Sequence, residues 1–342
     1  MKMKKWGIAL FGLLALALFL PAQENNDFYD NEPFIDLPLG TIEVAGEVVQ
    51  AGKVDLAALP LRTVLVREAR MENGKPAFVG SYVFQGYSLF DILRERVVKK
   101  KNEKEFRSII DLFVVIENKK GEKVIFSWGE IFYPTAPHRI LVAAKAARIV
   151  PSLTKERWPM PTVGKIVAAN DLVSERNLDD PVRITVLSPP LSFAVEKGKS
   201  PLFSAPARIV DHGREVGKIS RLPEGIPLLI LPSVFYGRGK GFHGIAYFEG
   251  APLRMVLKDI YPTDTTNLKR GYFVLAGDDG YRAVCSASEV FNRNDNGEFL
   301  IKFQGHNPFS GEKGYVPNFP DRSSEFPGQK SRKCSTVRSS SS

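Results

Sequence analysis

The stretch FQGYSLFDIL at residues 84–93 is echoed by FEGAPLRMVL at residues 248–257. In both, an aromatic and a polar residue precede a glycine, a leucine follows three positions later, and an aliphatic pair comes at helical spacing. The echo continues downstream, where Gly121 pairs with Gly280 and the offset of 159 positions is kept as far as Leu300. A period this long indicates two copies of one domain rather than a solenoid of short units.

Local patterns predict an α+β class that is mostly β. Alternation over residues 41–44 and the β-branched run at 63–66 predict strands. Asn73 and Gly74 form a tight-turn pair, and Gly121 lies between two apolar runs typical of a hairpin. Ser88 is well placed to cap a short helix. Glu130 and Glu289 recur at the 159 offset, most simply as caps or first-turn residues of short helices. Ser127 and Ser286 recur as well, but no motif ties a histidine or an acid to them. The triplet at residues 113–115 resembles the one at 273–275.

The N-terminus reads as a targeting segment. Three lysines precede an apolar run of 15 residues, Trp6 to Leu20, and Ala22 offers a small residue for cleavage. A bilayer-spanning helix needs about 20 apolar residues, so an uncleaved anchor is the less favoured alternative. We expect export by the general secretory route of a bacterium, a periplasmic or extracellular location, and no stable membrane span in the mature chain.

Charge and cysteine content exclude several classes. The formal net charge is +9, of which the predicted signal carries +3 and residues 321–342 carry +3. The remaining body shows no concentrated basic face with interleaved aromatics, so we expect no nucleic-acid partner. Two cysteines, Cys285 and Cys334, do not make a disulfide framework, and the four histidines lack metal-ligand spacing.

The chain divides at changes in composition and rhythm. The predicted parts are a signal peptide (1–22), a lead-in segment (23–38), repeat one (39–188), a Pro- and Ser-rich linker (189–206), repeat two (207–309) and a disordered tail (310–342). The 159 offset puts the counterpart of Val186 at position 345, beyond Ser342. We therefore expect repeat two to lack its closing strand, or to fill that place by a shorter path through residues 314–319.

The order of motifs along each repeat resembles that of a known family. It runs strand, Leu-Pro, strand, Gly-x-x-Leu-x-x-[Ile/Val]-Leu, a hairpin with glycine, and a closing Val-Arg-Ile-x-Val at residues 182–186. This order is similar to that of the molybdopterin-binding domain of sulfite-oxidase-type oxidoreductases. The resemblance implies two tandem mixed β-domains, each with a cofactor cleft beside the helix that follows the glycine.

The chain departs from that family at the metal ligand. Active members place a cysteine thiolate on molybdenum upstream of the helix, and a soft anionic sulfur suits such a metal. The corresponding runs, residues 66–74 and 232–238, contain no cysteine, and Cys285 lies downstream of the helix. We therefore predict two catalytically degenerate copies with no catalytic and no metal-ligating residue. We predict no cofactor from the residues themselves; molybdopterin is the cofactor that the family resemblance implies.

The candidate binding residues for an anionic ligand lie in these two runs and directly after the second one. They are Arg67 and Arg70 in repeat one, and Arg238, Lys240 and His243 in repeat two. Arginine grips oxyanions in a bidentate manner, and a glycine-rich loop exposes backbone N–H groups. The alternatives are a solvent-exposed strand edge at Arg67 and Arg70, a simple hairpin turn around Arg238 and Lys240, and a surface histidine.

Three functions stay open on the sequence alone. The first is an exported, non-catalytic binding or scaffold protein. The second is a molybdopterin-dependent oxidoreductase with an atypical metal ligand. The third is a purely structural protein in which one repeat packs on the other without a ligand.

Overall fold

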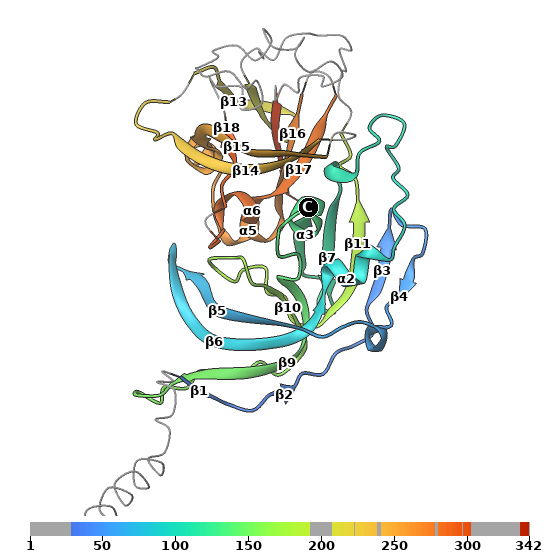
Figure 1. Cartoon of the computed structure of the whole chain (residues 1–342), viewed down its shortest axis with the longest axis vertical. Coiled ribbons are helices and arrows are strands. Elements are labelled where there is room, and N and C mark those ends of the chain that lie inside the picture. Colours follow the sequence, from blue (N-terminus) through green and yellow to red (C-terminus); the bar gives the residue numbers. More distant parts are fainter. Residues whose placement is uncertain are drawn as a thin grey trace, which may run out of the picture.

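The protein is mostly β, and each repeat consists of two sheets and a few short helices (Figure 1). The computed structural model describes residues 29–191, 207–221, 223–237, 241–277, 280–295, 297–301 and 336–341. The predicted signal peptide and residues 192–206 of the predicted linker lie outside these ranges. The mostly β class expected from the sequence is confirmed.

Repeat one contains the following elements: β1 (Tyr29–Asn31), β2 (Ile35–Asp36), β3 (Glu43–Gly46), β4 (Gly52–Lys53), η1 (Leu56–Ala58), β5 (Arg62–Glu72), β6 (Lys75–Ser88), α2 (Leu89–Arg94), η2 (Ile109–Asp111), β7 (Phe113–Asn118), β8 (Lys123–Ser127), α3 (Trp128–Phe132), β9 (Ile140–Pro151), β10 (Lys165–Ala168) and β11 (Pro181–Leu187). One sheet has the order β1-β9-β6-β5, with β2 and β10 also paired to β9, and the other has the order β4-β3-β11-β7-β8. Part of the predicted lead-in therefore belongs to a sheet, because β1 and β2 pair with β9.

Repeat two contains a second series of elements: β12 (Ala207–Asp211), β13 (Arg214–Ile219), β14 (Leu229–Gly237), β15 (Gly241–Pro252), α4 (Leu253–Leu257), α5 (Thr265–Arg270), β16 (Gly271–Ala276), β17 (Arg282–Ser286), α6 (Ala287–Phe291), β18 (Leu300–Ile301) and β19 (Thr336–Ser341). Its sheets have the orders β13-β12-β19-β16-β17 and β14-β15-β18.

The two repeats share one topology. The five-stranded sheets correspond strand by strand, and β9-β6-β5 corresponds to β18-β15-β14. The registers agree as well: Gly86 pairs opposite Arg62 as Gly250 pairs opposite Leu229. The internal duplication predicted from the echoed stretches is therefore present in the structure.

Several local predictions are also confirmed. The Ser88 side chain accepts the Asp91 N–H and caps α2. Asn73 and Gly74 take positive φ values of 50° and 75°, and Gly121 takes 80°, in the left-handed region that tight turns need. The predicted hairpin is β7–β8.

The prediction that repeat two lacks its closing strand is wrong. Strand β19 runs parallel to β12 and antiparallel to β16, as β11 runs with β3 and β7. Arg338 lies opposite Val274 where Thr185 lies opposite Val115, so the offset here is 153 rather than 159. Without β19 the facing backbone groups of β12 and β16 would have no partners. Residues 336–341 are thus part of a sheet, while 302–335 of the predicted tail lie outside the described ranges.

The repeats meet through equivalent faces. Phe113 pairs opposite Ser127, and Tyr272 pairs opposite Ser286. Phe113 therefore corresponds to Tyr272, whereas the sequence echo had matched it with Phe273. These two equivalent rings stack on each other, with centroids 4.6 Å apart and 21° between their planes. Around them lies one apolar cluster drawn from both repeats, consisting of Phe113, Ile125, Tyr272, Val274 and Val284. The interface is therefore close to two-fold symmetric.

Truncation of the stacked ring tests this interface. Phe113→Ala should lower the free energy of unfolding by about 3–5 kcal/mol, because it removes a buried aromatic side chain and leaves a cavity between the repeats. The measurement is chemical denaturation followed by circular dichroism. Phe34→Ala, at a ring that is 41% exposed, is the control and should cost less than about 1 kcal/mol. Equal losses in the two variants would contradict the packing described for Phe113.

Candidate functional site

Two of the five predicted anion-binding residues have side chains that the structure describes. Arg67 and Arg70 are exposed on β5, and the Arg67 guanidinium lies over the Phe78 ring at 5.4 Å. Arg238 and Lys240 lie outside the described residues, between the paired Gly237 and Gly241. The backbone of His243 belongs to β15, but its side chain is outside the described set. The anion site predicted on these five residues stays a prediction.

A buried polar cluster centred on Arg176 lies where the repeats join. This arginine belongs to the junction loop, defined as residues 169–180 between β10 and β11. Its Nε and Nη2 donate to the two oxygens of Asp171 at 2.8 and 2.6 Å, and its two Nη groups donate to Glu130, both at 2.9 Å. Nη1 also lies 3.1 Å from the Ser286 hydroxyl of repeat two.

Arg176 is permanently charged in this setting. Burial alone would lower its pKa, but the carboxylates of Asp171 and Glu130 outweigh burial and raise it. Its guanidinium is 2% exposed and stacks over the Phe126 ring at 4.3 Å. A buried group whose N–H donors all have protein acceptors leaves no room for a ligand, so we interpret the Arg176 cluster as structural.

Two equivalent helix caps complete this junction. Ser127 and Glu130 form a capping box on α3, and Ser286 and Glu289 form one on α6. The boxes touch, because the Ser127 hydroxyl donates to Glu289 Oε2 at 2.7 Å. The sequence predicted both glutamates as caps or first-turn residues and gave the serines no catalytic role. The caps are confirmed.

A different polar cluster lies in repeat one and reaches the surface. We call Arg62, Ser88, Asp91 and His138 the His138 cluster; they come from the start of β5, the cap and first turn of α2, and the segment before β9. Arg62 Nε and Nη2 donate to the two Asp91 oxygens at 2.8 and 3.3 Å. The His138 Nδ1 atom lies 3.0 Å from the Ser88 hydroxyl and 3.4 Å from Asp91 Oδ2. Arg62 and His138 are each 32% exposed, whereas the Asp91 carboxylate is 1% exposed.

The hydrogen bonds assign the tautomer of His138. The Ser88 hydroxyl donates to Asp91 Oδ2 at 2.8 Å and accepts the Asp91 N–H at 3.0 Å. Its proton is thus committed to the carboxylate, so the imidazole Nδ1 must be the donor toward Ser88. The Nε2 atom then carries a lone pair. Burial, opposed by Asp91 and helped by Arg62, lowers the pKa of His138 below its ordinary 6.5, so the ring is neutral near pH 7.

This arrangement is not a serine hydrolase triad. In a triad the acid and the serine contact opposite nitrogens of the imidazole. Here both lie at Nδ1, and Ser88 is fully buried. Burial favours protonation of Asp91, but the hydrogen bonds from Arg62 and Ser88 outweigh it and lower the pKa of Asp91. The cluster therefore presents a fixed cation at Arg62 and an oriented imidazole edge at His138.

Repeat two has no equivalent cluster. The positions that correspond to Arg62, Ser88, Asp91 and His138 are Leu229, Pro252, Met255 and Gly297. A polar group required by the fold itself would be expected in both copies, because the backbone around it is the same. The His138 cluster is thus specific to repeat one, and this favours a functional role. No local pattern in the sequence predicts this cluster, because His138 is 47 positions from Asp91 and no motif links them.

Partly buried aromatic rings flank the cluster. The Phe90 ring meets His138 edge-on at 5.3 Å and lies 5.2 Å from Phe132. Phe132 stacks on Trp128 at 4.2 Å. Arg94, at the end of α2, is half exposed and lies 3.7 Å from Asp91 while bonding Glu95 at 2.8 Å. The surface around His138 is therefore apolar on one side and cationic on the other.

Comparisons with known proteins give no relative for this chain: no family model, no curated protein and no solved structure matches it. In the part of the chain that the structure describes, no group of histidine, cysteine and acidic side chains is arranged to hold a metal ion. Within the same residues, no helix combines the length and hydropathy needed to traverse a bilayer.

The junction predicts a measurable pH dependence of stability. Burial, and then the carboxylate of Glu130, raises the pKa of Glu289 from 4.5 to about 8. Between pH 4.5 and about 8 the folded protein holds a proton on Glu289 that the unfolded chain has released. The contribution of Glu289 to the free energy of unfolding is therefore fully present below pH 4.5 and is lost as the pH rises to about 8. Glu289→Gln should remove this pH-dependent loss of stability. The free energy of unfolding of the variant, relative to that of the wild type, should therefore rise with pH by at most about 1.4 kcal/mol per pH unit.

Denaturation curves at a series of pH values make the comparison. Glu156→Gln, at an exposed position, is the control and should track the wild type throughout. A constant difference between Glu289→Gln and the wild type from acid to pH 8 would mean that Glu289 is ionised in the folded protein.

Proposed function

We propose that this is an exported, non-catalytic binding protein in which repeat one holds a small anionic ligand and repeat two supports it. The observation that carries the proposal is the His138 cluster, which is present in one copy of a duplicated domain and apolar in the other. Arg62 offers N–H groups to an oxyanion, as guanidinium groups commonly do. The cluster lies beside α2, the helix after the glycine, where the resemblance to sulfite-oxidase-type domains implies a cleft.

The tautomer of His138 narrows the ligand class. An imidazole that donates through Nδ1 accepts a hydrogen bond at Nε2, so the preferred ligand has both an anionic oxygen for Arg62 and a hydroxyl for His138. Hydrogen phosphate has both groups. Sulfate has no proton and requires His138 to become an imidazolium first.

The molybdopterin alternative receives less support from these residues. Cys285, the one cysteine within the described ranges, is buried in the core of repeat two and is not available as a thiolate ligand near α2 or α4. Analysis of protein purified from its native host for molybdenum and pterin distinguishes the oxidoreductase from the binding protein. Near one molybdenum atom per chain would favour the oxidoreductase with an atypical ligand over the binding protein.

Titration calorimetry with phosphate and sulfate tests the proposal. At about pH 7.5 the wild type should bind phosphate more tightly than sulfate, and the affinity for sulfate should rise as the pH falls below 6.5, because the pKa of His138 is lowered from that ordinary value and the ring gains its proton only below it. His138→Gln should weaken phosphate binding by about ten- to hundred-fold, the range expected for a hydrogen bond in a charged site, and should flatten the pH dependence for sulfate.

Two further variants locate the anion. Arg67→Ala is the matched control, because it removes an exposed arginine from the same strand as Arg62. It should bind phosphate like the wild type. Loss of binding in Arg238→Ala/Lys240→Ala, with His138→Gln unaffected, would instead move the ligand to the loop predicted in repeat two. No phosphate or sulfate binding by the folded wild type would leave the purely structural role.

A further inference from the structure

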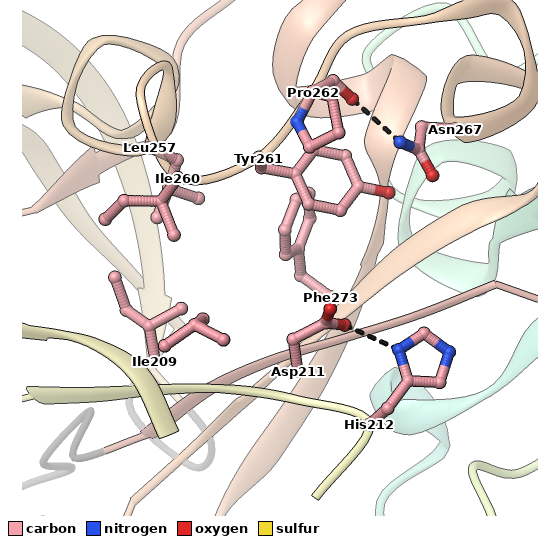
Figure 2. Close-up of a pocket in the computed structure, with 10 residues that line it drawn as sticks. Ile209, Asp211, His212, Leu257, Ile260, Tyr261, Pro262, Asn267 and Phe273 are labelled. Carbon is pink, nitrogen blue, oxygen red and sulfur yellow. Dashed lines mark hydrogen bonds and ion pairs between the residues drawn. The ribbon is translucent and has the colours of Figure 1, made fainter. Parts of the chain in front are cut away.

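Repeat two contains a pocket of its own, far from the His138 cluster in the fold. It has a volume of about 120 Å³ and is lined mainly by apolar side chains from β12, β13, α4, the segment after α4, and β16. Figure 2 shows Leu257 and Ile260 facing Ile209 across the opening, with Tyr261, Phe273 and Asp211 along the opposite side. Asp211 and His212 stand at the mouth, where their side chains are 42% and 63% exposed.

The pocket exists because the connection that follows α4 in repeat two is shorter than the connection that follows α2 in repeat one. Leu93 and Phe113 are 20 positions apart, whereas their counterparts Leu257 and Tyr272 are 15 apart. In repeat one the longer connection closes the equivalent place: the Val49 N–H donates to the Val97 carbonyl, and the Lys99 N–H donates to the Glu47 carbonyl, both at 2.8 Å. Val98 pairs with Val48 and packs on the core of repeat one. The five missing residues remove this cover from repeat two.

The walls are preformed by packing outside the pocket. Tyr261 lies 4.7 Å from Phe273 and stacks on Phe291 at 5.6 Å with 2° between the rings. Its hydroxyl is directed past the pocket, toward Gly271, where an added Cβ would meet it at 2.0 Å. The aromatic wall therefore does not depend on a ligand for its position.

Two carboxylates act on the Tyr261 ring. Burial raises the pKa of Tyr261, and the carboxylates of Asp211 and Asp264 raise it further. Asp264 is committed to the cap of α5, where it accepts the Asn267 N–H at 2.8 Å. Asp211, bonded to His212 at 2.9 Å, borders the pocket itself. An aromatic face next to a carboxylate attracts a cation.

We infer that this pocket binds a small hydrophobic ammonium, with its hydrocarbon part between Ile209, Leu257 and Ile260 and its charged end toward Asp211 and the Tyr261 and Phe273 rings. The volume sets the size of the hydrocarbon. Apolar cavities of roughly 150 Å³ accept benzene, so the repeat-two pocket suits a branched or cyclic group of about four to six carbons. The Asp211 carboxylate at the mouth of the pocket disfavours the corresponding carboxylates.

Three probes with one carbon skeleton separate shape from charge. They are 3-methylbutylamine, 3-methylbutan-1-ol and 3-methylbutanoate, each titrated into the full chain and followed by ligand-observed NMR. The amine should bind with a dissociation constant in the millimolar range or below, the alcohol should bind more weakly, and the carboxylate should not bind. Equal binding of amine and carboxylate, or no binding of the amine, would overturn the inference.

Two variants place the amine in the pocket. Asp211→Asn should weaken amine binding about ten-fold and leave alcohol binding unchanged, because it removes the charge and keeps the shape. Val216→Phe, at a pocket-lining position that is 45% exposed, should block binding of the amine and the alcohol without unfolding the protein. The matched controls are Asp36→Asn and Val49→Phe, at exposed positions of repeat one. Amine binding that survives both pocket variants would refute the assignment.

Discussion

The buried guanidinium group of Arg176 links the parts of the chain that meet at the junction between the two repeats. Arg176 is stable inside the protein because Asp171 and Glu130 neutralise it and because its remaining donors meet Ile125 and Ser286. Removal of Asp171 or Glu130 would weaken the neutralisation of this buried charge, which is costly. The junction loop, the cap of α3 and the cap of α6 therefore depend on one another. The same loop also binds the edge of β5, where the Ser174 N–H donates to the Ala69 carbonyl at 2.7 Å.

With the scaffold fixed in this way, the two copies are free to differ in their sites. Repeat one has a long connection that seals its sheet and a polar cluster beside α2. Repeat two has a short connection that leaves a pocket open, and apolar residues at the positions of the polar cluster. Duplication followed by local change explains both differences without a change of fold. The backbone is shared, and the chemistry resides in a few side chains and one connection.

Local signals in the sequence were sufficient for part of this structure. The Gly-x-x-Leu echo predicted the duplication, and Ser88, Gly121 and Glu130 predicted a cap, a hairpin and a second cap because each acts within a few residues. The closing strand β19 could not be placed by extending a constant offset, since a sheet position is defined by pairing and the connection before it has a different length. The junction loop is rich in charged residues and so looks like surface; its burial depends on partners 40 to 120 positions away. The convergence of Arg62, Asp91 and His138 depends on tertiary contacts in the same way.

The state of one imidazole tests the functional account most directly. The chain has only four histidines, so the ¹H–¹⁵N spectrum of the imidazole rings can be assigned with His138→Gln as a reference. We expect that His138 at pH 7 is neutral, carries its proton on Nδ1, and shows a shift of its Nε2 resonance when phosphate is added. A proton on Nε2, or a phosphate response at another histidine with His138 unchanged, would contradict it.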